Sequence, residues 1–322
     1  MKYLFTGWIL INIIFFAPVV NAQKWEKYID KYNSYYEKGD YDKALSTNEK
    51  FKKKVTKKLG PANKYIPFVY MNYAKISLQK GELLNVEKNL IEAVTVSDTV
   101  NRNNDKEHSN ILLLAIELYI ELGSIRLAHE TLSQFHERFG ETSDAETKAR
   151  LLLFEIEILK EKGYYNEAVT KARENFMFFA ERTNDKSIRK DERNFRNRQL
   201  AALINLTGEA FIRKGNYQSA DSALKSNTAW IEKNLSKGDP EWVIHKLRVG
   251  WSTEYQRNYK DAEKLFEDAF NDSKSGRSTS DRFVLSTQEE LIKVYARHGK
   301  NNKYDAELSR YQTQITQSYS NK

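Results

Sequence analysis

The chain of 322 residues contains no cysteine, which excludes disulfides, cysteine nucleophiles and thiolate metal ligands. Proline is also scarce, and the four prolines are Pro18, Pro61, Pro67 and Pro240. No stretch alternates apolar and polar residues as a half-buried strand would. Residues 110–123 and 147–163 instead repeat apolar side chains with the period of an amphipathic helix. The sequence therefore predicts an all-α protein that gains its stability from helix packing alone.

The motifs of common enzyme classes are missing as well. The sequence contains no HExxH metal site, no phosphate-binding GxxxxGK[ST] or GxGxxG loop and no GxSxG nucleophile elbow. Two of the five histidines, His129 and His136, lie seven residues apart rather than at the i, i+4 spacing of a helical metal pair. We therefore expect no catalytic residue, no metal and no cofactor, and an enzyme is the least favoured class of function.

Charge does not single out a partner. The chain has 52 basic and 44 acidic residues, a formal net charge of +8, and the two signs are intermixed. This pattern is typical of solvated helix surfaces, and we expect no nucleic-acid partner. Two basic segments stand out, at 50–58 and 182–198. The first is explained by lysines near a helix C-terminus, and both leave contact with an anionic surface as an alternative.

Residues 1–22 have the layout of a secretory signal peptide. Lys2 precedes an apolar run, and Val20 and Ala22 occupy the small-residue positions of a cleavage site. The alternative is an uncleaved membrane anchor, since the run approaches the length of a spanning helix. We expect cleavage and an exported, periplasmic or secreted chain. The abundance of Lys, Asn, Tyr and Ile is typical of an AT-rich bacterial genome.

A short motif around a glycine recurs along the whole remaining chain. The copies are KGDYDKA at Gly39, KGELLNV at Gly81, LGSIRLA at Gly123, KGYYNEA at Gly163, KGNYQSA at Gly215, QRNYKDA at Arg257 and HGKNNKY at Gly299. The steps between them are 42, 42, 40, 52, 42 and 42 residues. Such regularity is the signature of a repeat protein. The longer step contains the basic insertion at 182–198, which either extends a helix or forms a loop.

Each copy predicts a helical hairpin. The glycine ends a first helix, because it adopts positive φ without a steric penalty. A second helix then begins, and a small residue lets the two helices approach closely. The small residues are Ala44, Ala128, Ala168, Ala220 and Ala262. The predicted units span roughly 23–60, 61–102, 103–143, 144–182, 194–237, 238–275 and 282–318.

The tandem Gly-x-Tyr-x-x-Ala pattern resembles the tetratricopeptide repeat (TPR). The 42-residue period is similar to the long repeats of kinesin light chain and of bacterial proteins that pair them with a CHAT protease domain. The resemblance implies a right-handed superhelical α-solenoid of about seven hairpins, whose first helices line a concave groove. It implies that these side chains face the groove: Asn33, Tyr36, Met71, Lys75, Glu117, Glu157, Asn205, Glu209, Trp251, Lys293 and Arg297.

The resemblance implies a non-enzymatic scaffold or adaptor that binds a protein or peptide along this groove. Some TPR grooves clamp a C-terminal carboxylate with two Asn and three cations, and Asn33 and Asn72 match the amides. The cationic positions hold Ile29, Asn110 and Leu114, which argues against that clamp here. The alternative function is a module that binds envelope polysaccharide or an anionic surface. Its basic residues would be Arg189, Lys190 and Arg193 of the insertion.

Overall fold

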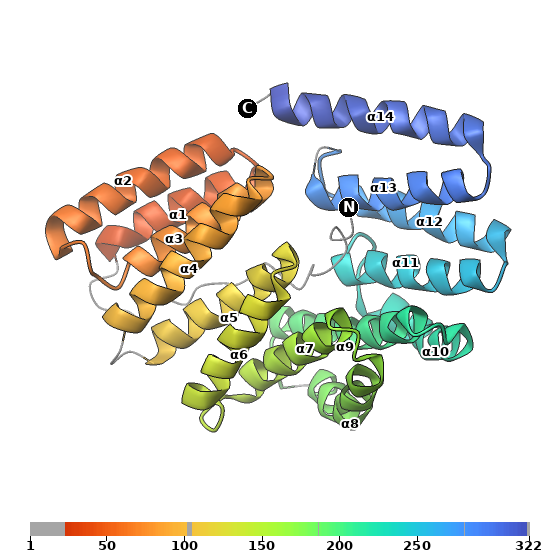
Figure 1. The fold of residues 1–322 in the computed structure, drawn as a ribbon, viewed down its shortest axis with the longest axis horizontal. Coiled ribbons are helices and arrows are strands. Elements are labelled where there is room, and N and C mark those ends of the chain that lie inside the picture. The colour runs from red at the N-terminus through yellow and green to blue at the C-terminus, as the bar shows by residue number, and fades with distance from the viewer. Residues whose placement is uncertain (1–22, 102–104, 186, 280, 321–322) are drawn as a thin grey trace. The chain divides into compact units, whose positions relative to one another are not determined.

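The computed structural model describes residues 23–101, 105–185, 187–279 and 281–320, so the predicted signal peptide lies outside the described residues. Within these ranges the chain forms fourteen α-helices and no strand (Figure 1). The helices are α1 Gln23–Glu37, α2 Tyr41–Leu59, α3 Ile66–Gln79, α4 Leu83–Val100, α5 Asp105–Leu122, α6 Ile125–Phe139, α7 Ala145–Glu161, α8 Tyr165–Thr183, α9 Lys190–Arg213, α10 Tyr217–Asn234, α11 Pro240–Tyr255, α12 Tyr259–Ser273, α13 Arg282–Arg297 and α14 Asn301–Ser320. They pair into seven hairpins, and the predicted all-α solenoid fold is confirmed.

The chain divides into two compact units. Unit 1 ends at Asp144 and contains α1–α6, and unit 2 begins at Ala145 and contains α7–α14. Within each unit a first helix packs on its hairpin partner, and the second helix packs on the first helix of the next hairpin. Each hairpin thus buries its apolar face against its neighbours. No helix in the described part of the chain is long and apolar enough to span a bilayer.

The turn inside each hairpin depends on positive φ. At the first turn Gly39 has φ 74°, its N–H donates to the Tyr36 carbonyl, and the Asp40 N–H donates to the Tyr35 carbonyl. This pair of bonds closes the helix C-terminus. Asp40 then caps the second helix by accepting from the Lys43 N–H at 3.2 Å. The glycine motif in the sequence is therefore a turn between two helices.

Small residues set the spacing between the two helices of a hairpin. The recurring alanines are buried, and Ala44, Ala128, Ala220 and Ala262 have no exposed surface. Gly208 and Gly250 add a second close approach on the first helices α9 and α11. A Cβ at Gly208 would lie 2.5 Å from Leu224, and one at Gly250 would lie 3.0 Å from Phe266. These contacts explain why glycine is tolerated inside two helices despite its entropic cost.

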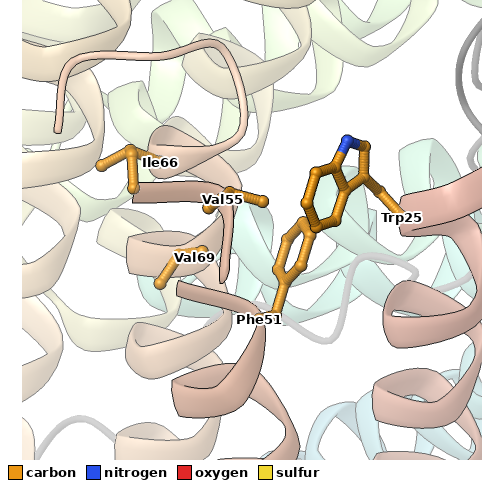
Figure 2. Packing of buried hydrophobic residues seen from close by; sticks show 5 residues of the cluster. All are labelled: Trp25, Phe51, Val55, Ile66 and Val69. Atoms are coloured by element: carbon orange, nitrogen blue, oxygen red, sulfur yellow. The ribbon is translucent and has the colours of Figure 1, made fainter. Parts of the chain in front are cut away.

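Aromatic side chains form the core of the first hairpin. Trp25 of α1 packs on Phe51 of α2, as Figure 2 shows. Their ring centroids are 6.1 Å apart. Phe51 is 2% exposed, and Val55 and Val69 beside it are fully buried. The indole of Trp25 closes this core at the start of the helical array. Tyr28 of α1 also stacks on Phe51, and Tyr32 of α1 is buried, so these aromatic side chains serve packing in unit 1.

The basic insertion is both a loop and a helix extension. Helix α8 ends at Thr183, and α9 begins at Lys190 and runs for 24 residues. Its arginines form ion pairs within unit 2. The pairs are Arg182–Glu146, Arg189–Asp191, Arg196–Glu192 and Arg198–Asp239. Asp239 also caps α11 by accepting from the Glu241 N–H at 3.1 Å, so Arg198 ties the extension of α9 to the start of α11.

Candidate ligand groove in unit 2

The first helices of unit 2 carry charged or aromatic residues at a position that repeats with the turns. Glu157, Glu209, Trp251 and Lys293 each lie six residues before the turn residue of their hairpin. They therefore occupy equivalent positions on α7, α9, α11 and α13. Because α9 packs on both α7 and α11, charges on these helices can meet across hairpins.

Four of the charged residues form what we call the ionic cluster: Glu157, Lys160, Glu209 and Arg248. Lys160 Nζ lies 2.8 Å from Glu157 Oε1 and 3.0 Å from Glu209 Oε2. Arg248 Nη2 lies 2.6 Å from the same Glu209 oxygen. None of the four is more than 3% exposed. The cluster links α7, α9 and α11, and buried charges of this kind require their partners.

Burial and neighbouring charges shift the pKa values of the two carboxyls of the ionic cluster in opposite directions. Burial raises the pKa of Glu157, and Lys160 only partly opposes this effect. Burial also acts on Glu209, but Arg248, Lys160 and Arg213 outweigh it and lower the pKa of Glu209 well below its usual range. Glu209 is thus the anion that holds the cations of this cluster.

A second buried cluster, the amide–histidine cluster, lies between α9, α10 and α11. Asn205 Nδ2 donates to Glu241 Oε2 at 2.9 Å, and Asn205 Oδ1 lies 3.0 Å from His245 Nδ1. The other ring nitrogen of His245 lies 3.0 Å from Thr228 Oγ1. Since Asn205 Oδ1 can only accept, His245 Nδ1 is the donor in that bond. Burial raises the pKa of Glu241 to about 8 and lowers the pKa of His245 to about 4.

A groove of about 1800 Å³ opens beside the ionic cluster, at the turn ends of three consecutive hairpins. Its walls come from the ends of α9, α11 and α13 and from the starts of α10 and α12. Arg213 lines the groove and also donates to Glu209 at 2.9 Å. Trp251 lines it as well and lies under the guanidinium of Arg248, 4.4 Å from the ring centroid. The ionic cluster therefore supports one wall of the groove.

Tyrosines form the rim of the groove. Tyr217 and Tyr255 stack in parallel with centroids 4.5 Å apart. Tyr259 packs edge-on against His298 at 5.0 Å. Tyr255 is 54% exposed and Tyr259 is 52% exposed, so both present ring surface to a ligand. Exposed rings held by neighbours are well suited to binding, because little side-chain entropy is lost.

Three cations form what we call the basic stripe: Arg257 in the turn before α12, and Lys260 and Lys264 near the start of that helix. All three line the groove and are exposed. Among the residues that the structure describes, none has an acidic partner within ion-pair distance. Arg297, another cation of the lining, is neutralised, because it forms a bidentate pair with Glu254 through two bonds of 2.8 Å. The unpaired positive charge of the groove therefore comes from the basic stripe.

Two of the eleven predicted groove residues, Trp251 and Arg297, line this groove. Lys293 is half-buried and pairs with Glu289 and Glu290. Glu157, Asn205 and Glu209 are at most 3% exposed and belong to the two buried clusters. In these positions they support the helices rather than offer surface to a ligand.

The remaining predicted groove residues lie in unit 1. Met71, Lys75 and Glu117 are buried, and burial lowers the pKa of Lys75. Asn33 and Tyr36 of α1 are half-buried, and Tyr36 stacks on Tyr32 at 5.8 Å. The predicted residues are thus divided between the two units.

Sequence reasoning missed Arg248, Glu254 and Tyr255. They lie nine, three and two residues before Arg257, on the helix that carries the predicted Trp251. The two-residue offset of Tyr255 reaches Arg213 in α9 and Arg297 in α13, so the repeat spacing contained part of the signal. The basic stripe follows a turn, in the second helix, where the resemblance places no groove residue. No group of three His, Asp or Glu residues able to hold a metal is present in the described part of the chain.

The fold is that of TPR-like repeat proteins. NprR in complex with its cognate peptide NprX has a TM-score of 0.61 and 15% identity, covering 91% of this chain and 78% of that chain. A Rap protein complexed with Competence and Sporulation Factor has a TM-score of 0.56 and 11% identity, covering 93% and 79%. The apo form of RapI has a TM-score of 0.53 and 9% identity, covering 91% and 77%. No protein-family model matches the chain, and no curated protein matches it by sequence.

Proposed function

We propose that this chain is a non-enzymatic scaffold that binds a peptide or an extended protein segment in the groove of unit 2. The groove carries the proposal. Its volume of about 1800 Å³ exceeds the roughly 300–1,000 Å³ of small-molecule pockets. Exposed tyrosines and an unpaired basic stripe lie along it, and buried ion pairs hold α9 and α11 of its wall in place. A similar fold, that of NprR, has been crystallised with a peptide, which supports this class of ligand.

Peptide selection tests the proposal directly. Peptides selected from a random phage library on the purified chain are synthesised and titrated by calorimetry into the wild type and two variants. Trp251→Ala removes an indole from the groove wall, and Trp230→Ala removes one from α10 outside the lining. We expect Trp251→Ala to weaken binding about tenfold or more, as for an aromatic hot spot, and Trp230→Ala to leave it unchanged.

A third variant, the second in the groove, distinguishes loss of binding from loss of folding. Tyr255→Ala changes an exposed rim residue and should weaken binding while the helical circular dichroism signal stays intact. If the selected peptides bind all three variants as tightly as the wild type, the ligand does not use this groove.

We also propose that the chain is exported. The support is the predicted signal at 1–22, and the test is N-terminal sequencing of the chain from its native source. Cleavage after Ala22 gives a chain that begins at Gln23, whereas a retained Met1 contradicts the proposal. The alternative of envelope binding through the insertion has less support. Arg182, Arg196 and Arg198 are engaged in ion pairs, which leaves fewer cations for a surface.

A further inference from the structure

Unpaired charge in the groove has one dominant sign. Four of the five acidic residues of the lining have a basic partner within ion-pair distance. The pairs are Glu254–Arg297, Glu263–Lys303, Glu267–Lys303 and Glu290–Lys293. Asp268 is the exception in the described residues. Within the described part of the chain, the lining therefore has one acidic residue without such a partner and three cations without one, those of the basic stripe. Unpaired cations beside exposed rings favour a ligand with carboxylates.

The backbone conformation at Arg257 is also unusual. Arg257 has φ 66° and is the only non-glycine residue with positive φ in the part of the chain that the structure describes. The turn keeps the usual bonds: the Arg257 N–H donates to the Glu254 carbonyl at 2.8 Å, and the Asn258 N–H donates to the Thr253 carbonyl at 3.2 Å. Glycine would form the same turn without the steric cost of a Cβ. The turn therefore does not require the arginine side chain that reaches the groove.

We infer that the groove of unit 2 takes an acidic peptide segment, whose carboxylates bind Arg257, Lys260 and Lys264 while its apolar side chains pack on Tyr255 and Tyr259. This inference rests on the proposed function and names the ligand class of the same site. Lys260 and Lys264 lie one helical turn apart, on one face. From Lys260 to Lys264 the helix rises about 6 Å, close to two residues of extended peptide. Acidic residues at alternate positions of such a segment match this span.

Three labelled nonapeptides test the inference by fluorescence anisotropy on the purified chain. They share a central tyrosine and carry Glu, Gln or Lys at alternate positions. We expect the Glu peptide to bind about tenfold more tightly than the Gln peptide, and the Lys peptide to bind more weakly still. Binding of the Glu peptide should weaken as salt is raised, because exposed charges are screened.

The variant Arg257→Gly should change binding and stability in opposite directions. It should weaken binding of the Glu peptide about threefold, as expected for one exposed ion pair, and raise the melting temperature by about 2–4 °C. The double variant Lys260→Gln, Lys264→Gln should weaken binding about tenfold. The matched control Lys233→Gln removes one exposed charge from α10 outside the lining and should change neither quantity.

The results that overturn the inference differ from those that overturn the proposed function. If the Gln and Glu peptides bind equally, or if Arg257→Gly leaves binding unchanged, the acidic ligand class is wrong. In that case Trp251→Ala still weakens binding of the selected peptides, and the peptide scaffold stands. If no peptide binds while alginate, an acidic polysaccharide, does, both the inference and the proposed function are wrong.

Discussion

Two sets of charges in unit 2, the ionic cluster and the basic stripe, behave in opposite ways. In the ionic cluster, Lys160 and Arg248 are buried and share one carboxylate, that of Glu209. In the basic stripe, Arg257, Lys260 and Lys264 are exposed, and no acidic partner lies within ion-pair distance among the described residues. Both sets line or support the same groove. The cations of the two sets carry the same charge, and they differ in burial and in ion pairing.

The difference indicates which charges serve the fold and which are available to a ligand. A buried cation whose carboxylate is removed remains desolvated without compensation, which is costly. An exposed cation without a partner costs little folding free energy, because it stays hydrated, and it remains available to bind an anionic ligand in the groove. Stability measurements should therefore respond to the ionic cluster, and binding measurements should respond to the basic stripe.

The largest effect is expected at Glu209. Glu209→Gln keeps the shape of the side chain but leaves Lys160 and Arg248 without their shared anion. We expect a loss of about 3–5 kcal/mol in the free energy of unfolding, as for other buried pairs that lose one partner. Urea unfolding followed by circular dichroism measures it. The control is Glu232→Gln on α10, which is exposed and should change stability by less than about 0.5 kcal/mol. Equal unfolding midpoints for the two variants would show that the cluster is not structural.

The next effect concerns pH and the amide–histidine cluster. Burial raises the pKa of Glu241 from 4.5 to about 8. The folded chain therefore keeps a proton that the unfolded chain has lost, and stability falls as pH rises toward 8, by about 1.4 kcal/mol per pH unit. Burial lowers the pKa of His245 from 6.5 to about 4, so its contribution falls as pH decreases below 6.5.

The two opposing slopes should nearly cancel between about pH 4.5 and 6.5, which leaves a decline of about 2 kcal/mol between pH 6.5 and 8. Urea midpoints at these two pH values measure it. Glu241→Gln keeps an oxygen that can accept from Asn205 but cannot titrate, so it should abolish the decline. A decline of the same size in that variant would assign it to other groups.

The hairpin architecture could be predicted from the sequence because the turn motif is local. Gly39 and its counterparts signal the end of a helix from their own conformational preference, and the alanines signal close packing from their size. The close contacts at Gly208 and Gly250 could not be predicted in this way, since a glycine inside a helix does not indicate which residue packs against it. Their partners, Leu224 and Phe266, are known only once the hairpin is folded.

The groove could be predicted only in part because its pairing is non-local. Glu157 and Glu209 were predicted to face a groove, yet Lys160 meets Glu209 from a different hairpin, across the irregular 182–198 segment. Which of two helix faces becomes buried depends on that packing. Arg257 was visible in the sequence as a turn without glycine. Its unpaired charge in the groove depends on the acidic residues of α11, α12 and α13 finding other partners.

The smallest effect is expected from exchanging the residues of two equivalent turns. Arg257→Gly should raise the free energy of unfolding by about 1 kcal/mol, whereas Arg257→Ala should leave it nearly unchanged, because alanine keeps the Cβ that φ 66° disfavours. In the neighbouring hairpin, where φ is 81°, Gly215→Ala should lower it by about 1 kcal/mol. Thermal unfolding of the three variants measures these differences. If Arg257→Gly and Arg257→Ala are equally stable, the turn is unstrained, and the basic stripe then has only its unpaired charge to mark it as a binding surface.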